Sequence, residues 1–328
     1  MRRREFIAAI GGLLAWPVDM HGEDRERVRR IGILNTLPSY DDHGQERIGA
    51  FLQALQQEGW TIGANLRVDQ RWSAGNISEL RKLGEELVAL KPAVIVATGG
   101  LAVGPLLEIT RIVPIVFVNT PDPVGAGFID SLARPGGNAT GFTQFEYSTS
   151  VKWLEMLKQI APAVTRVGVL RDPNTPSGIG QFGAMQGAAS TFGVVLVPLG
   201  VRDAAEIERA VSGFASADNG GLIVTTGGLT TLHRELISAL ALRHKLPAVY
   251  PADYFVTAGG LVSYGPDRID MYRQAAGYVD RILKGESPAN LPVQTPTKYD
   301  MVVNLRAAKA LGLTVPPTLI ATATEVIE

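Results

Sequence analysis

Apolar blocks from the first half of the chain return in the second half, and this recurrence limits the possible folds more than any other feature. The pairs are RIGIL (30–34) with RVGVL (166–170), VIVATGG (94–100) with LIVTTGG (222–228), and VPIVFVNTPD (113–122) with LPAVYPAD (246–253). Each copy follows its partner after roughly 130 residues, a period that indicates a duplicated or pseudo-symmetric pair of sheets. The sequence therefore predicts two similar lobes that face each other across a cleft.

The blocks themselves are continuous Val/Ile-rich runs that end in small polar residues. Such runs are typical of parallel strands buried on both faces, because helices cover both sides of the sheet. Ligands of parallel sheets bind at the carboxyl ends of the strands. In the first half these ends carry Thr98, Gly99, Gly100, Asn119, Thr120 and Asp122.

Composition excludes several classes of protein. The chain has 328 residues, which is enough for two hydrophobic cores, and its net charge of −1 offers no basic surface for nucleic acid. Because it has four His and no Cys, we expect no disulfide and no metal site. No G-x-G-x-x-G follows the first predicted strand, and neither a P-loop nor G-x-S-x-G occurs, so no cofactor is expected. A binding protein is favoured; the alternative is an enzyme of two-lobed α/β architecture acting on a small carboxylate.

The amino terminus has the layout of an export signal. Arg2, Arg3 and Arg4 precede an apolar run from Ile7 to Val18, which is too short to span a bilayer, and RREFI resembles the twin-arginine pattern. We expect residues 1–27 to direct export to the periplasm; a short cytosolic amphipathic helix is the alternative. No A-x-A-like site follows, so the cleavage position stays open.

Strands and helices alternate along the rest of the chain. The predicted strands cover 31–35, 66–72, 93–98, 113–119, 166–170, 194–199, 221–225, 247–250, 261–264 and 299–304, with a short one within 133–142. The predicted helices cover 44–58, 103–109, 124–132, 148–160, 178–191, 204–216, 232–244, 271–283 and a short stretch ending at 311. Asn76, with Glu79 three residues on, predicts a further capped helix that ends before Pro92. Two prolines in VPPTL (315–319) are expected to end regular structure.

Thr98, Gly99 and Gly100 precede a predicted helix, whose free N–H groups suit a carboxylate. A plain tight turn is the alternative, and the echo at Thr225 and Thr226 leaves the two interpretations evenly balanced. Asp122 is a candidate partner for a solute ammonium. Because Pro123 follows it, it could instead serve only as a helix N-cap, but we lean towards ligand contact.

Asp172 poses the same ambiguity after the strand 166–170, and we expect it to act as a cap, with Arg171 beside it as a candidate carboxylate partner. Other candidates near predicted strand ends are Thr36, Thr120, Tyr40, Tyr250, Tyr254 and Tyr264. An aromatic ring there can stack on a flat ligand and bond through its hydroxyl. Of the aromatic residues, Tyr250 and Tyr264 are the predicted ligand contacts.

Several longer motifs resemble a known family. The segments DPVGAG…LARPGGNATG and PTKYDMVVNL…AKALGL, together with the order of blocks around them, resemble the substrate-binding proteins of ABC importers. Within that family they are similar to the branch with tryptophan- and tyrosine-binding members, and the resemblance covers nearly all the chain beyond about residue 30.

This resemblance implies an α/β, type I periplasmic-binding fold: two Rossmann-like lobes with parallel sheets, joined by three crossovers. It implies residues 28–144 plus 266–290 for the first lobe and residues 145–265 plus 291–328 for the second. The implied function is capture of a small solute by lobe closure and delivery to an ABC permease in the inner membrane, for which a monomer suffices. An amino acid, aromatic or branched, is the expected solute; an aromatic carboxylate without an amine is the alternative if Asp122 only caps.

Overall fold

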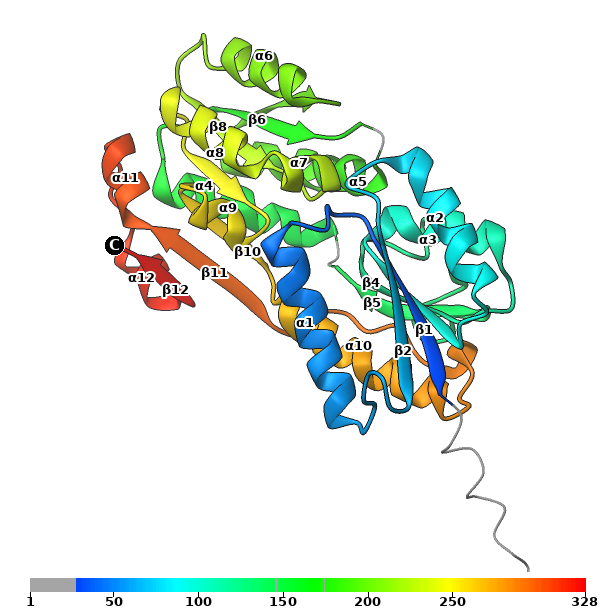
Figure 1. The fold of residues 1–328 in the computed structure, drawn as a ribbon. Helices are drawn as coiled ribbons and strands as arrows, with labels where there is room; N and C mark the ends of the chain where they lie inside the picture. Colours follow the sequence, from blue (N-terminus) through cyan, green and yellow to red (C-terminus); the bar gives the residue numbers. More distant parts are fainter. Residues whose placement is uncertain (1–27, 145–146, 174) are drawn as a thin grey trace, which may run out of the picture.

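The computed structural model describes residues 28–144, 147–173 and 175–328, so the predicted export segment lies outside the described residues. Two sheets form two lobes, one of five strands in the order β2-β1-β3-β4-β5 and one of seven in the order β12-β11-β10-β9-β8-β6-β7 (Figure 1). The strands of the first lobe are β1 (Arg29–Asn35), β2 (Leu66–Trp72), β3 (Val94–Thr98), β4 (Ile115–Thr120) and β5 (Ala139–Thr143). The strands of the second are β6 (Arg166–Arg171), β7 (Val195–Gly200), β8 (Gly220–Val224), β9 (Ala248–Tyr250), β10 (Val262–Pro266), β11 (Tyr299–Asn304) and β12 (Glu325–Ile327).

The two lobes repeat one topology, as the echoed blocks predict. The order β2-β1-β3-β4 of the first sheet corresponds to β7-β6-β8-β9 of the second, and the three echoed pairs are β1 with β6, β3 with β8, and β4 with β9. All pairings in the first sheet are parallel, whereas β10 and β11 pair antiparallel in the second. In the first sheet Asn35 lies opposite Thr98, which lies opposite Val118, so the polar strand ends meet at one edge.

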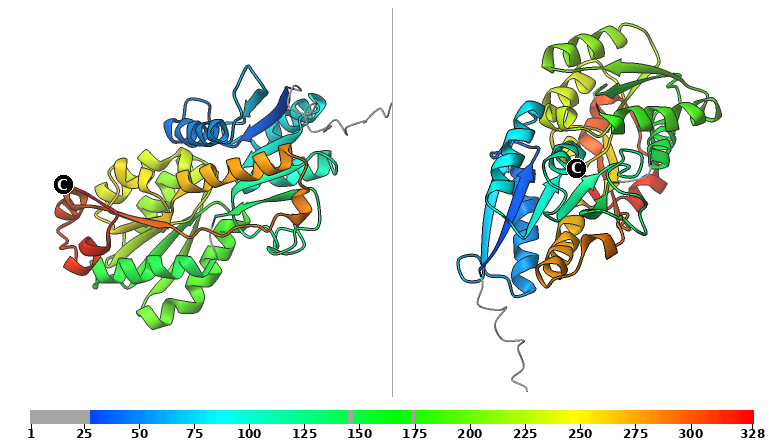
Figure 2. Two further views of the ribbon diagram at one scale, coloured as in Figure 1. Left: turned by 90° about the horizontal axis from the view of Figure 1, so that it is seen from below. Right: turned by 90° about the vertical axis from the view of Figure 1, so that its right-hand side faces the viewer.

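Helices cover both faces of each sheet because the strands between them are apolar on both sides. In the first lobe α1 (Asp42–Gln57) and α10 (Arg268–Leu283) lie side by side on one face, and α2 (Ile77–Ala89) and α3 (Gly100–Ile109) cover the other (Figure 2). The remaining helices, which belong to the second lobe, are α4 (Val151–Ile160), α5 (Pro176–Ala188), α6 (Ala204–Phe214), α7 (Gly228–Leu232), α8 (Arg234–Arg243), α9 (Asp253–Thr257), α11 (Leu305–Leu311) and α12 (Pro317–Thr322). The predicted helix 232–244 is interrupted in the structure. Leu232 is the last residue of α7 and Arg234 the first of α8, so the two helices meet at His233.

The predicted capping of α2 is confirmed, because the Asn76 side chain accepts hydrogen bonds from the backbone N–H groups of Ser78 and Glu79. The predicted helix 124–132 is wrong. Residues 123–127 form tight turns, in which the N–H of Phe128 donates to the Pro123 carbonyl and Gly127 adopts a φ of 71°. Glycines in this stretch favour turns over helix because they lose more backbone entropy on ordering.

The expectation for VPPTL is also wrong. Pro317 stands in the first turn of α12, where the missing N–H of proline costs no hydrogen bond and its fixed φ suits a helix. The strand β12 then pairs parallel with β11 at the edge of the second sheet. The two prolines therefore start an element rather than end the regular structure.

The chain crosses between the sheets between β5 and α4, between β10 and α10, and again before β11. The last crossing falls later than expected from the resemblance. The N–H groups of Val293 and Gln294 donate to the carbonyls of Leu132 and Gly141 in the first lobe, at 2.7 and 2.9 Å. We therefore propose residues 28–144 plus 267–294 as the first lobe, and the rest of the described chain as the second. No helix among the described residues is long and apolar enough to cross a membrane.

Candidate ligand-binding site

A cavity of about 340 Å³ lies between the two lobes. Its first-lobe wall is formed by residues at the ends of β1, β3 and β4 and on α1 and α3, and its second-lobe wall by residues around α5, α7 and α9. The residues that line it are Asn35, Thr36, Leu37, Gly44, Arg47, Ile77, Thr98, Gly99, Gly100, Leu101, Gly104, Pro105, Asn119, Pro121, Ala126, Phe128, Gln144, Thr175, Ser177, Thr226, Gly227, Gly228, Thr231, Tyr254 and Tyr272. The cavity thus occupies the edge where ligands of parallel sheets bind.

Five of the predicted site residues line this cavity: Thr36, Thr98, Gly99, Gly100 and Thr226. Gly99 adopts a φ of 84°, which favours glycine, and a Cβ there would lie in tight contact with Thr36 Oγ1, at 3.0 Å. The α3 helix begins at Gly100, so its first N–H groups open at this wall. Contact of these residues with a ligand stays a prediction.

Two asparagines at the strand ends have polar atoms without hydrogen-bond partners. Thr98 Oγ1 donates to Asn35 Oδ1 at 2.8 Å, which leaves buried Asn35 Nδ2 without an acceptor among the described residues. Asn119 Oδ1 is likewise buried and has no donor in the described part of the chain, and Asn119 adopts a left-handed φ of 62°. Buried polar atoms are usually satisfied, so these two atoms beside the cavity are candidate hydrogen-bond partners for a ligand. The sequence signal for these two residues is their position at the ends of apolar strands, Asn35 as the last residue of β1 and Asn119 as the last but one of β4.

The second-lobe wall is held by hydrogen bonds among small polar residues. Thr226 N and Oγ1 both contact Gln181 Oε1, at 3.0 and 3.3 Å, and Ser177 Oγ donates to the Thr226 carbonyl. Thr231 Oγ1 lies 3.0 Å from the Tyr254 hydroxyl. These bonds fix the side of the cavity that the sequence identified only through Thr226.

Asp122 does not line the cavity. Its Oδ1 accepts a hydrogen bond from the Gly125 N–H at 2.9 Å, and its own φ of 37° is left-handed. The structure therefore places Asp122 as the cap of the turn that replaces the predicted helix. The lean towards ligand contact is corrected accordingly.

Three other predicted residues lie behind the walls. Thr120 is fully buried at the end of β4, and Thr225 Oγ1 donates to the Leu170 carbonyl at 3.0 Å. The Arg171 guanidinium stacks over the Phe182 ring at 5.3 Å, away from the cavity. The expected cap role of Asp172 is also wrong, because Thr175 is the N-cap of α5 and its N–H and hydroxyl contact the Asp172 carbonyl.

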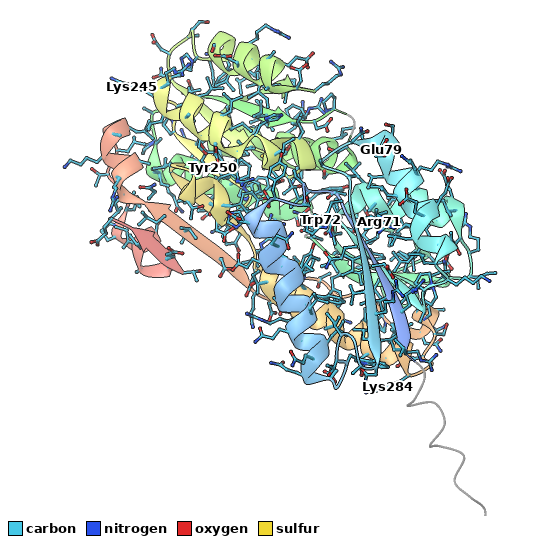
Figure 3. All side chains as sticks on the ribbon, in the orientation of Figure 1. Arg71, Trp72, Glu79, Lys245, Tyr250 and Lys284 are labelled. Carbon is cyan, nitrogen blue, oxygen red and sulfur yellow. The ribbon has the colours of Figure 1, made fainter. Side chains whose placement is uncertain are left out.

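Both predicted tyrosines belong to the second-lobe core. Tyr250, which is labelled in Figure 3, lies in the second lobe. It is 0 % exposed and stacks on Phe255 at 5.1 Å, and its burial raises the pKa of the phenol. Tyr264 stacks on Tyr299 at 5.4 Å and packs against apolar core residues. Alternation along a strand directs these side chains away from the ligand edge. Tyr254 lines the cavity instead, from the short helix α9.

Sequence reasoning also missed Arg47, which lies within α1. Arg47 is 7 % exposed, lines the cavity, and lies 5.5 Å from the centre of the Tyr254 ring. Arg268 lies 5.4 Å from the centre of the same ring, with its Nη2 donating to the Pro251 carbonyl. Nothing in the local sequence distinguishes Arg47 from a solvated helix arginine.

An ion pair joins the lobes at the rim of the cavity. Arg234 Nη1 on α8 donates to Asp41 Oδ2 at 2.8 Å, while Asp41 Oδ1 accepts from the Gly44 N–H and caps α1. The side chains are 17 % and 4 % exposed. Arg234 Nη1 also donates to the carbonyl of Thr231, which lines the cavity. The two lobes are thus held together beside the site.

The family model described as ABC transporter substrate binding protein matches residues 38–327. The chain belongs to this family. A tyrosine-binding protein of Clostridioides difficile (strain R20291) is 25 % identical to this substrate-binding protein over 292 residues, which are 88 % of this chain and 83 % of the relative.

Solved structures share the fold of this substrate-binding protein. A conserved domain protein from Vibrio cholerae superposes with a TM-score of 0.86 at 26 % identity, covering 92 % of this chain and 100 % of that one. An ABC domain from Streptococcus pneumonia in complex with L-Trp gives 0.85 at 24 % identity, covering 91 % and 99 %. A ligand-free, open substrate binding protein with adhesive properties from Clostridium difficile gives 0.69 at 25 % identity, covering 92 % and 99 %. The predicted fold class and family are confirmed.

Proposed function

We propose that this substrate-binding protein captures a small solute in the inter-lobe cavity, by closure of the lobes, and delivers it to its permease. The expected solute is an amino acid or a related carboxylate with an aromatic or branched body. The protein acts in the periplasm after export, as a monomer and without a catalytic step. The main support is a cavity between the lobes, where Asn35 and Asn119 each have a buried polar atom with no hydrogen-bond partner among the described residues.

The size and the walls of the cavity support this class of solute. Its volume of about 340 Å³ lies in the range of small-molecule sites, which are mostly apolar with a few placed polar groups. The apolar residues that could enclose a flat or branched body are Leu37, Ile77, Leu101, Pro105, Phe128, Tyr254 and Tyr272. The tyrosine-binding relative supports an aromatic amino acid.

Capture by closure is supported by the arrangement of the lobes. The ion pair between Arg234 and Asp41 spans them. The open, ligand-free relative superposes with a TM-score of only 0.69, whereas the Vibrio cholerae protein reaches 0.86 at similar identity and coverage. A lower score at equal coverage fits a rigid-body displacement of one lobe, and a solute shifts such an equilibrium by its differential affinity for the closed form.

A thermal-shift screen of the purified protein tests the proposal, with amino acids, aromatic acids, sugars and nucleosides as solutes. A solute at a hundred times its dissociation constant should add about 2.7 kcal/mol to the free energy of unfolding. A shift with an aromatic or branched amino acid or acid supports the proposal. Turnover of a solute without any shift of the melting temperature would instead favour the alternative, an enzyme of two-lobed α/β architecture.

A further inference from the structure

Arg47 is a buried cation without an anion. It is 7 % exposed and lines the inter-lobe cavity, yet no carboxylate oxygen lies within 4.0 Å of it, and it makes no side-chain hydrogen bond, in the described part of the chain. Removing a guanidinium from water without a partner is unfavourable. The Arg47 guanidinium lies over the Tyr254 ring, 5.5 Å from the ring centre, in a cation–π contact. Among the described residues, Arg47 therefore lacks a negatively charged partner.

The cavity itself offers no such charge. Among the described residues that line it, Arg47 is charged and none is Asp or Glu. Arg47 also lines a smaller cavity of about 150 Å³, where Glu46, Asp253, Asp267 and Asp300 face it together with His43 and Arg268. Two of these carboxylates already accept backbone hydrogen bonds: Asp253 accepts from the Tyr254 N–H, and Asp267, the N-cap of α10, accepts from the Asp270 N–H.

We propose that Arg47 binds the carboxylate of the solute, so that the cavity selects organic acids, amino acids included, over amines, sugars and neutral amides. Arginine presents a planar fork of donors that matches a carboxylate. The N-terminus of α3 opens at the same cavity and adds a favourable field for an anion. Because Arg47 lies on the first lobe and Tyr254 on the second, the carboxylate site is complete only when the lobes are closed. This inference rests on the proposed function and names its chemical class.

The test compares an acid with its primary amide in two versions of the protein. Titration calorimetry measures the affinities of L-phenylalanine, 3-phenylpropanoate and L-leucine, and of the primary amide of each. The proteins are the unmodified chain and Arg47→Met. The unmodified chain should bind at least one acid about thirty-fold or more tightly than its amide, the usual effect of an unpaired buried charge. In Arg47→Met, which keeps the volume of the side chain, this preference should fall to about three-fold or less.

Arg268→Met is the matched control. Arg268 has the same exposed fraction, 7 %, and contacts the same Tyr254 ring, but it does not line the inter-lobe cavity. It should retain the acid-to-amide preference even if its melting temperature falls. Equal preference in Arg47→Met and the unmodified chain would overturn the inference, as would a solute from the thermal-shift screen that binds without a carboxylate. If no solute binds in either experiment, the proposed function itself fails.

Discussion

Removing the Arg234 charge should weaken solute binding although Arg234 does not line the cavity. In the closed form Arg234 Nη1 donates to Asp41 Oδ2 at 2.8 Å across the lobes. Opening the lobes returns both groups to water, while Asp41 Oδ1 can keep its bond to the Gly44 N–H because both residues belong to the first lobe. The ion pair therefore favours the closed form alone.

The magnitude follows from burial. The Asp41 side chain is 4 % exposed and that of Arg234 17 %, so in Arg234→Gln a nearly buried carboxylate oxygen loses its charged donor. Charge-assisted hydrogen bonds contribute about 1.5–3 kcal/mol net. If the free protein is mainly open, this loss falls on the bound state, and each 1.4 kcal/mol is about ten-fold in affinity. We expect binding to weaken by about ten- to a hundred-fold, chiefly through faster dissociation.

Calorimetry with the best solute of the screen measures the affinity, and small-angle scattering measures the radius of gyration of the free protein. Asp41→Asn completes a double-mutant cycle, because its amide oxygen can still cap α1. Arg243→Gln is the control on the same helix, since Arg243 is exposed and its carboxylate partner Glu208 lies 3.9 Å away within the second lobe. An Arg234→Gln protein with unchanged melting temperature and unchanged affinity would refute the role of the ion pair in closure.

Three further changes separate stability from binding. Asp122→Ala removes the bond to the Gly125 N–H and should lower the unfolding free energy by about 0.5–2 kcal/mol in denaturant titrations, with affinity unchanged. Gly141→Ala would place a Cβ 1.9 Å from the Phe117 carbonyl oxygen, so we expect a loss of more than about 3 kcal/mol or no folded protein at all. Burial, and then a neighbouring guanidinium, lower the pKa of His43 below 6.5. The unfolded chain therefore binds the proton more readily, and stability should decline as the pH falls below about 6.5, less so in His43→Gln.

Most of the fold could be predicted because its central strands, such as β3 and β8, are buried on both faces. A continuous Val/Ile run such as 94–98 is compatible with few structures other than a buried strand. The strand 66–72 is followed a few residues later by Asn76, which caps the next helix. Errors arose where proline and glycine decide between helix and turn. Pro123 opens a turn because Gly125 and Gly127 follow, whereas Pro317 opens a helix.

The site was predictable only as far as it lies at strand ends. The rule that ligands bind at the carboxyl ends of parallel strands identified Thr98, Gly99 and Gly100. The local sequence is enough to place these three residues at a strand end. The same rule chose Tyr250 over Tyr254, although the first belongs to a strand directed into the core and the second to a short helix after it. Arg47 and the pair Arg234–Asp41 reach the site through packing between distant elements, which no local pattern records.

The Arg47 charge and the inter-lobe ion pair should act on the empty protein in opposite directions. Closure without solute buries Arg47 with no counter-ion, which opposes the closed form, while the bond between Arg234 and Asp41 favours it. A solute carboxylate pairs with Arg47 and so removes the cost of burying this cation, but it leaves the Arg234–Asp41 bond unchanged. Solute binding and lobe closure are therefore coupled through the charge of Arg47. Arg47→Met should therefore make the solute-free protein more compact in small-angle scattering, although it binds acids weakly. A solute-free Arg47→Met protein as extended as the unmodified chain would show that burying this cation does not hold the lobes apart.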